Sequence, residues 1–176
     1  MNELITFGLL AFTSFITLIN PMGSMPIFMT MTAELTSRER GRTARKASII
    51  SFFTLLLFAF MSDYLFDFFG ISINSLKIVG GVIFFLMGMD MLQARLTKVK
   101  VKDSEVKSYI NDISITPLAI PIICGPGAIT NAILLMKEAD DVGKKFVLIA
   151  TIFAVIAISY IVLSSSSRII KLQALM

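Results

Sequence analysis

Two prolines, a glycine and an asparagine interrupt a long apolar stretch near the start of the chain. Residues 19–28 read INPMGSMPIF. Proline lacks a backbone donor and clashes with the carbonyl one turn earlier, so Pro21 and Pro26 are predicted to interrupt the helix twice within two turns. In hydrocarbon, broken backbone is tolerated only where protein packs on it or where it lines a wet cavity. The segment is therefore a candidate functional site.

The rest of the chain is apolar enough to lie in a membrane. Of its 176 residues, 56% are hydrophobic and only 16% are charged, and the mean hydropathy is +0.84. We therefore expect one all-α membrane domain, a polytopic helix bundle in the lipid bilayer, because a span needs roughly 20 residues and a soluble domain is more polar. The predicted apolar segments lie at about 4–31, 47–62, 75–92, 113–136 and 146–163.

Several chemistries are excluded by composition. The chain has no histidine and one cysteine, Cys124, which excludes Ser-His catalysis, His-ligated metals and an internal disulfide. We expect no enzyme activity, catalytic residue, cofactor, metal site or nucleic-acid partner. Cys124 is interpreted as a small apolar filler. Asp90 is interpreted as an interfacial residue, with a role as proton or gate partner left open.

The spacing of the two prolines recurs later in the chain. Pro21 and Pro26 are matched by Pro121 and Pro126, an offset of 100 residues. Because three spans separate the two copies, the second is predicted to lie inverted in the membrane relative to the first, as is common in secondary transporters. Each half would then start with a broken helix.

The two predicted halves differ in length. Repeat one is expected at about 1–92, followed by a polar linker at 93–112 and an incomplete repeat two at about 113–176. A sixth span matching residues 75–92 is missing or truncated. Either this is a shortened form or another chain completes the bundle, and a homo-oligomer is left open.

Lysine and arginine residues predict the orientation, because cytoplasmic loops hold the excess of both. With the N-terminus outside, twelve of the sixteen fall on the inner side: five in a predicted loop at 34–46, five at 93–112 and two near the C-terminus. The arginines at 38–45 are interpreted as topology determinants. The outer side holds the other four, Lys77, Lys137, Lys144 and Lys145.

Three glycines in the third apolar segment predict a close helix contact. Gly80 and Gly81 precede Gly88 by eight and seven residues. This spacing places all three on one helical face, where the missing Cβ atoms let another backbone approach. We interpret this face as a packing surface.

Each break is predicted to expose unpaired backbone groups. Amides after Pro26 and around Gly125 and Gly127 could hold a carboxylate, and carbonyls near 18–20 and 116–118 could receive an ammonium group or a cation. A small zwitterion would satisfy both poles, with a coupling proton or sodium ion left open. The predicted substrate-binding residues are Asn20, Pro21, Gly23, Ser24, Pro26, Thr116, Pro117, Pro121, Gly125, Pro126, Gly127, Thr130 and Asn131.

The broken stretches also resemble those of a known family. Residues 20–28 (NPMGSMPIF) and 115–121 (ITPLAIP), the latter followed by GPGAI at 125–129, are similar to the two signature stretches of the MarC family. The resemblance implies an inner-membrane protein of six spans with inverted halves, within the superfamily that includes the LysE exporters. Some MarC members are described as transporters of small neutral amino acids such as glycine and alanine, while others have no settled role. It also implies substrate-binding stretches at 20–26 and 117–127.

Two functions are compatible with these features. The first is a secondary transporter of small neutral amino acids that works by alternating access of the two halves around the breaks. The alternative is a structural or regulatory membrane subunit without transport activity, whose breaks serve packing with a partner.

Overall fold

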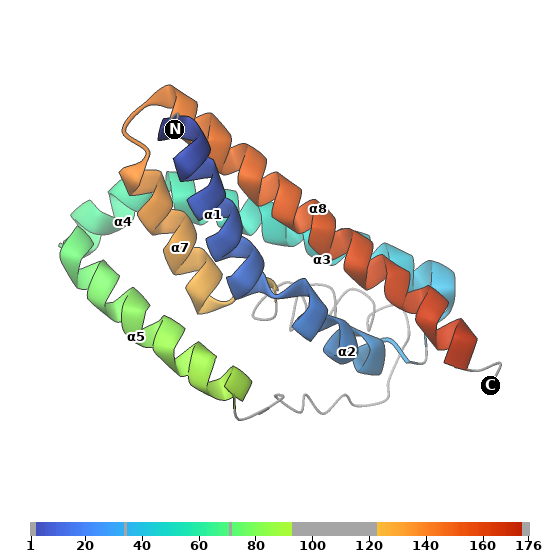
Figure 1. Ribbon diagram of the computed structural model, residues 1–176. Helices are drawn as coiled ribbons and strands as arrows, with labels where there is room; N and C mark the ends of the chain where they lie inside the picture. Colours follow the sequence, from blue (N-terminus) through green and yellow to red (C-terminus); the bar gives the residue numbers. More distant parts are fainter. Residues whose placement is uncertain (1–2, 34, 71, 93–122, 174–176) are drawn as a thin grey trace.

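A computed structural model describes residues 3–33, 35–70, 72–92 and 123–173 of the chain (Figure 1). Within these ranges the fold is all-helical, as expected. The predicted linker at 93–112 and the first part of the fourth apolar segment lie outside the described residues. The described helices are α1 (Glu3–Ile19), α2 (Pro21–Met31), α3 (Ser37–Phe60), α4 (Ser62–Phe69), α5 (Ile73–Leu92), α7 (Pro126–Glu138) and α8 (Val142–Gln173).

Three of the described helical segments are long and apolar enough to cross a membrane. They are the 29 residues from Glu3 to Met31, which include α1 and α2, the 24 residues of α3, and Val142–Ser165 of α8. Large apolar side chains on these segments stay exposed, among them Phe53 and Phe153, which are 63% and 62% exposed. Exposed apolar surface on this scale is typical of a lipid-facing or binding surface. The prediction of a helical membrane protein is confirmed.

The core lies where α8 and α7 pack against the other helices. α8 contacts α1, α2 and α3, while α7 contacts α3, α5 and α1. Buried residues recur every third or fourth position, which is the spacing of one helix face. On α3 this face carries mostly small side chains, which let membrane helices approach closely. The buried residues of α3 are Arg40, Thr43, Ala44, Ala47, Ser48, Ser51, Leu55 and Ala59.

The charged segment at 34–46 is helical over most of its length, not a loop as predicted. α3 begins at Ser37, ten residues before the predicted start at Ala47. Its start is fixed by a capping box: the Thr36 amide donates to the Glu39 carboxylate at 2.9 Å, and the Glu39 amide donates to Thr36 Oγ1 at 3.4 Å. The hydropathy pattern does not predict this start, because the residues in the first three turns of α3 are polar.

α8 likewise begins before its predicted start at Phe146. Its first residue is Val142, and the Lys144 amide donates to Asp141 Oδ1 at 2.8 Å, which caps the first turn. The helix also continues past the predicted end of the segment, to Gln173. Side-chain caps, rather than the change from polar to apolar sequence, therefore decide where α3 and α8 begin.

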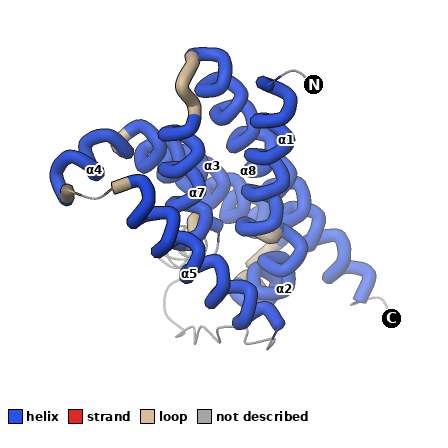
Figure 2. Tube along the Cα trace, turned by 60° about the vertical axis from the view of Figure 1, so that its left-hand side comes forward, coloured by secondary structure: helices blue, strands red, loops and turns tan. Residues whose placement is uncertain are grey.

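The two helix pairs α2–α3 and α7–α8 run in opposite directions. From the middle of the bundle, α7 runs toward the end where the N-terminus lies and α2 toward the opposite end (Figure 1, Figure 2). This is the predicted inverted arrangement. The offset of 100 is wrong for the helices, however: α2 and α7 begin at Pro21 and Pro126, and α3 and α8 at Ser37 and Val142, each pair 105 residues apart. The two helices therefore align when Pro21 is matched with Pro126, and not when Pro21 is matched with Pro121.

Candidate functional site

The first break consists of a single residue, Asn20. Its backbone adopts the left-handed conformation (φ 43°, ψ 69°), which asparagine tolerates better than most residues. Pro21 is the first residue of α2, where its missing N–H costs nothing. The Asn20 Oδ1 accepts from the Gly23 amide at 3.1 Å. A Cβ at Gly23 would lie 2.4 Å from Asn20 Nδ2, so this cap requires glycine.

One prediction about this break is wrong. Pro26 lies inside α2 and does not end it, so the helix breaks only once; Pro26 removes a single hydrogen bond from the ladder, and the amides after it belong to a continuous helix. The carbonyls at the break are also paired. Ser24 Oγ lies 3.2 Å from the Ile19 carbonyl and 3.1 Å from that of Asn20, and the Ser24 amide donates to the latter at 3.0 Å. The first break therefore satisfies part of its own backbone through Ser24.

The second break is capped differently. Gly125 is extended (φ −63°, ψ 163°) and caps α7 without any side-chain hydrogen bond, and Pro126 is the first helical residue. Gly127 and Ala128 follow in the first turn and are buried. First-turn amides have no partner within their helix. This N-terminus therefore combines a positive dipole end with buried first-turn residues whose amides receive no hydrogen bond from the side chain of the N-cap residue.

Polar side chains of α7 contact two different helices. Asn131 Nδ2 donates to Ser14 Oγ of α1 at 3.0 Å. Thr130 faces α5, where a Cβ at Gly80 would lie 2.9 Å from Thr130 Cγ2. Both α7 side chains are buried. The structure thus brings the predicted residues Thr130 and Asn131 into the interior, one against each neighbouring helix.

The predicted glycine face of α5 is only partly confirmed. Gly80 is buried at the contact with α7, but Gly81 is exposed, and a Cβ there would meet nothing within 4 Å. Consecutive helical residues point about 100° apart, so only one of the two can face α7. The side chain of Asp90, and the predicted site residues Thr116, Pro117 and Pro121, lie outside the description.

Two buried serines of α3, Ser48 and Ser51, were not predicted as site residues from the sequence. Cys124 Sγ donates to the Ser51 carbonyl at 3.2 Å, which supports its interpretation as a packing residue. Ser48 Oγ and Ser51 Oγ are buried without a hydrogen-bond partner in the described part of the chain. Their spacing in the sequence could have indicated a shared role, because small polar residues three positions apart lie on one helix face. Which neighbour that face meets is decided by the fold.

Arg40 has a structural role beyond topology. It is 7% exposed, and its Nε and Nη2 donate to the carbonyls of Thr32 and Ala33 at 2.8 and 2.6 Å. These carbonyls lie at the C-terminal end of α2, where the helix dipole favours a cation. Arg40 therefore caps the C-terminal end of α2, and Asn20 caps its N-terminal end. No group of three or more metal-ligating side chains occurs in the ranges that the structure describes.

Comparison with known proteins gives the family. Residues 5–174 match the sequence model of the "MarC family integral membrane protein" group. The chain belongs to the MarC family. The resemblance of its two broken stretches to those of the family is thereby confirmed.

Several MarC relatives are similar over most of this chain. A membrane protein of Pyrococcus abyssi is 39% identical over 171 residues, covering 97% of this chain and 82% of the relative. One of Methanocaldococcus jannaschii is 36% identical over 163 residues (92% and 80%), and one of Bacillus subtilis 37% over 156 residues (85% and 72%). Their names describe them as UPF0056 membrane proteins and state no substrate. No solved structure matches the chain.

Proposed function

We propose that this MarC protein is a secondary transporter of small neutral amino acids of the glycine and alanine type. The observation that carries the proposal is the pair of half-helices, α2 and α7, which start in the middle of the bundle and run in opposite directions (Figure 1). Transporters of this architecture bind their substrates at discontinuous helices near the middle of the membrane. The two halves would rock around these breaks, driven by a proton or sodium gradient.

The substrate carboxylate is proposed to bind at the N-terminus of α7. Gly127 and Ala128 of its first turn are buried, and the N-cap residue, Gly125, has no side chain to cap their amides. Asn131 lies one turn further along the same helix and uses one amide proton for Ser14, which leaves a second proton and the carbonyl oxygen for a ligand. Gly127 has no Cβ, so a ligand can approach the backbone amides of this turn closely.

We also propose that the protein lies in the inner membrane with its N-terminus outside. At the end of the bundle that holds the N-terminus, three of the four lysines are neutralised by acidic side chains. The opposite end carries arginines 38, 42 and 45 of α3, all of them exposed, as the excess of positive charge on cytoplasmic surfaces requires. The ion pairs of the lysines are Lys77–Glu138 (2.8 Å), Lys137–Asp63 and Lys144–Asp140 (2.7 Å).

Cysteine labelling in intact cells tests the orientation. The native Cys124 is only 1% exposed, so a membrane-impermeant maleimide should report introduced cysteines alone. Asp140→Cys should be labelled, and Arg38→Cys should be labelled only after the cells are opened. The reverse pattern would place the N-terminus inside.

Uptake into liposomes tests the transport proposal. The purified protein should accumulate labelled glycine or alanine under a proton or sodium gradient. Asn131→Leu keeps the side-chain volume but removes the buried polar groups, and should lower uptake at least tenfold. Thr17→Val is the matched control, because Thr17 is exposed and its hydroxyl bonds only the Thr13 carbonyl of its own helix. Absence of uptake for every small amino acid under both gradients would refute transport and favour the structural subunit.

A further inference from the structure

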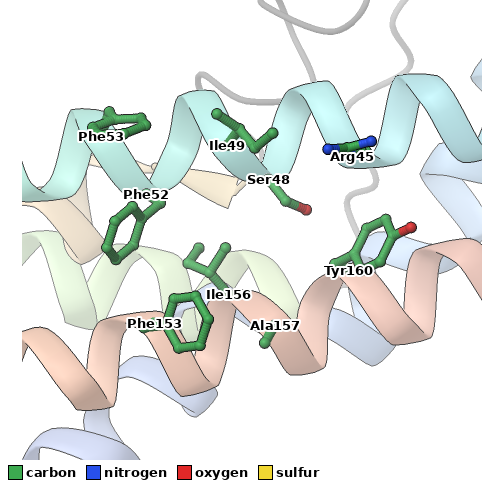
Figure 3. Close-up of a pocket in the computed structure, with 9 residues that line it drawn as sticks. All are labelled: Arg45, Ser48, Ile49, Phe52, Phe53, Phe153, Ile156, Ala157 and Tyr160. Carbon is green, nitrogen blue, oxygen red and sulfur yellow. The ribbon is translucent and has the colours of Figure 1, made fainter.

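A cavity of about 250 Å³ lies between α3 and α8, and none of its lining residues belongs to either break (Figure 3). One end of it is aromatic. Phe52 packs edge-to-face against Phe153 of α8, with ring centroids 5.9 Å apart, and against Phe53 at 5.6 Å. Phe53 and Phe153 are both more than 60% exposed. The cavity therefore opens onto the apolar outer surface of the bundle.

The cavity is lined almost entirely by apolar atoms, but polar side chains stand at the rim of its other end. Arg45 of α3 and Tyr160 of α8 flank it, and Ser48 projects into the space between them (Figure 3). Ser48 is 5% exposed, and its Oγ has no hydrogen-bond partner in the described residues. Leaving a buried hydroxyl unpaired costs about 1–3 kcal/mol.

The sequence of α3 shows how the cavity lies relative to the membrane. Six of the ten residues at 37–46 are charged, and none of the fourteen at 47–60 is. The polar end of the cavity, at Arg45, therefore lies at the membrane boundary, and the aromatic end lies within the hydrocarbon. Arginine and tyrosine are typical residues of this boundary.

We propose that the cavity binds one anionic phospholipid. Its phosphate is held at the rim of the cavity by the exposed Arg45 guanidinium and by the Tyr160 hydroxyl, and part of an acyl chain packs against Phe52 and Phe153. The cavity is smaller than the about 300–1,000 Å³ of most small-molecule pockets and is open to the bilayer, so a segment of a chain fits it better than a compact solute. Arg45 selects a negative headgroup. The proposal does not depend on transport.

Tryptophan quenching tests this proposal directly, because the chain contains no tryptophan. Phe153→Trp places a single fluorophore at the aromatic end of the cavity. The protein is reconstituted in phosphatidylcholine vesicles with 10 mol% of a lipid brominated on its acyl chains. Brominated phosphatidylglycerol should quench the introduced indole at least threefold more than brominated phosphatidylcholine at the same mole fraction. Phe146→Trp is the matched control, since Phe146 lies two turns earlier on the same face of α8, is 69% exposed and does not line the cavity.

Second substitutions in the Phe153→Trp background distinguish lipid binding in the cavity from a general attraction of anionic lipid to positively charged residues. Arg45→Gln should abolish the preference for phosphatidylglycerol, whereas Arg38→Gln, which removes an equal charge outside the cavity, should keep it. Ala157→Leu narrows the cavity without changing any charge and should also lower the preference. Equal quenching by both lipids, a preference that survives Arg45→Gln, or shielding of the introduced indole from both lipids would overturn the proposal.

Discussion

A methyl group added at Gly80 tests the packing of α5 on α7. The Cβ of Gly80→Ala would lie 2.9 Å from Thr130 Cγ2, whereas carbon atoms in contact are about 3.5–4.0 Å apart. The neighbouring Gly81→Ala meets nothing within 4 Å. Both changes gain the same helix propensity, about 0.8–1.0 kcal/mol. The difference between the two variants therefore isolates the clash.

The expected size of this difference follows from overpacking data. An extra methyl group in a packed interior typically costs about 1–3 kcal/mol. Gly81→Ala should thus be neutral to about 1 kcal/mol more stable than the parent, and Gly80→Ala should be about 1–3 kcal/mol less stable than Gly81→Ala. Unfolding in mixed micelles, followed by far-UV circular dichroism, measures both, because the chain has no tryptophan to report by fluorescence.

A rescue experiment decides whether the clash is the cause. Thr130→Ser removes the Cγ2 atom that the new Cβ would meet but keeps the hydroxyl, so it should restore most of the stability lost in Gly80→Ala. In the Gly81→Ala variant, Thr130→Ser should not raise the stability. Equal stability of the two alanine variants, or failure of Thr130→Ser to rescue, would refute the packing of α5 on α7 described above.

Three other contacts give further predictions. Arg40→Met should lower the unfolding free energy by about 1.5–3 kcal/mol for each of the two lost hydrogen bonds, measured in the same micelles. A double-mutant cycle of Ser14→Ala and Asn131→Leu should give a coupling energy of about 0.6 kcal/mol and at most about 1.7 kcal/mol, the range for polar contacts between membrane helices. The hydrogen bond from Lys144 lowers the pKa of Asp140, so this carboxylate stabilises the folded protein above the ordinary aspartate pKa, and the contribution is lost as pH falls through the lowered pKa. The small stability deficit of Asp140→Asn at pH 7 should therefore disappear in acid, as melting temperatures against pH would show.

The sequence by itself determined the class of protein and the two stretches in which a helix is broken. Apolar segments of the right length require a membrane environment, because a chain with so little polar surface cannot cover itself in water. A proline accepted at a first helical position marks the starts of α2 and α7, at Pro21 and Pro126. These features are local, since they depend on residues within one or two turns of each other.

Only the tertiary structure decided which of several equivalent residues carry the interior contacts. Nothing local distinguishes Arg40 from its neighbouring arginines, or Gly80 from Gly81, yet one of each is buried and the others are exposed. The bond between Ser14 and Asn131 joins residues 117 apart in the chain. Such contacts depend on the rotation and depth of each helix relative to its neighbours. Packing of whole helix faces sets both, so no short stretch of sequence contains them.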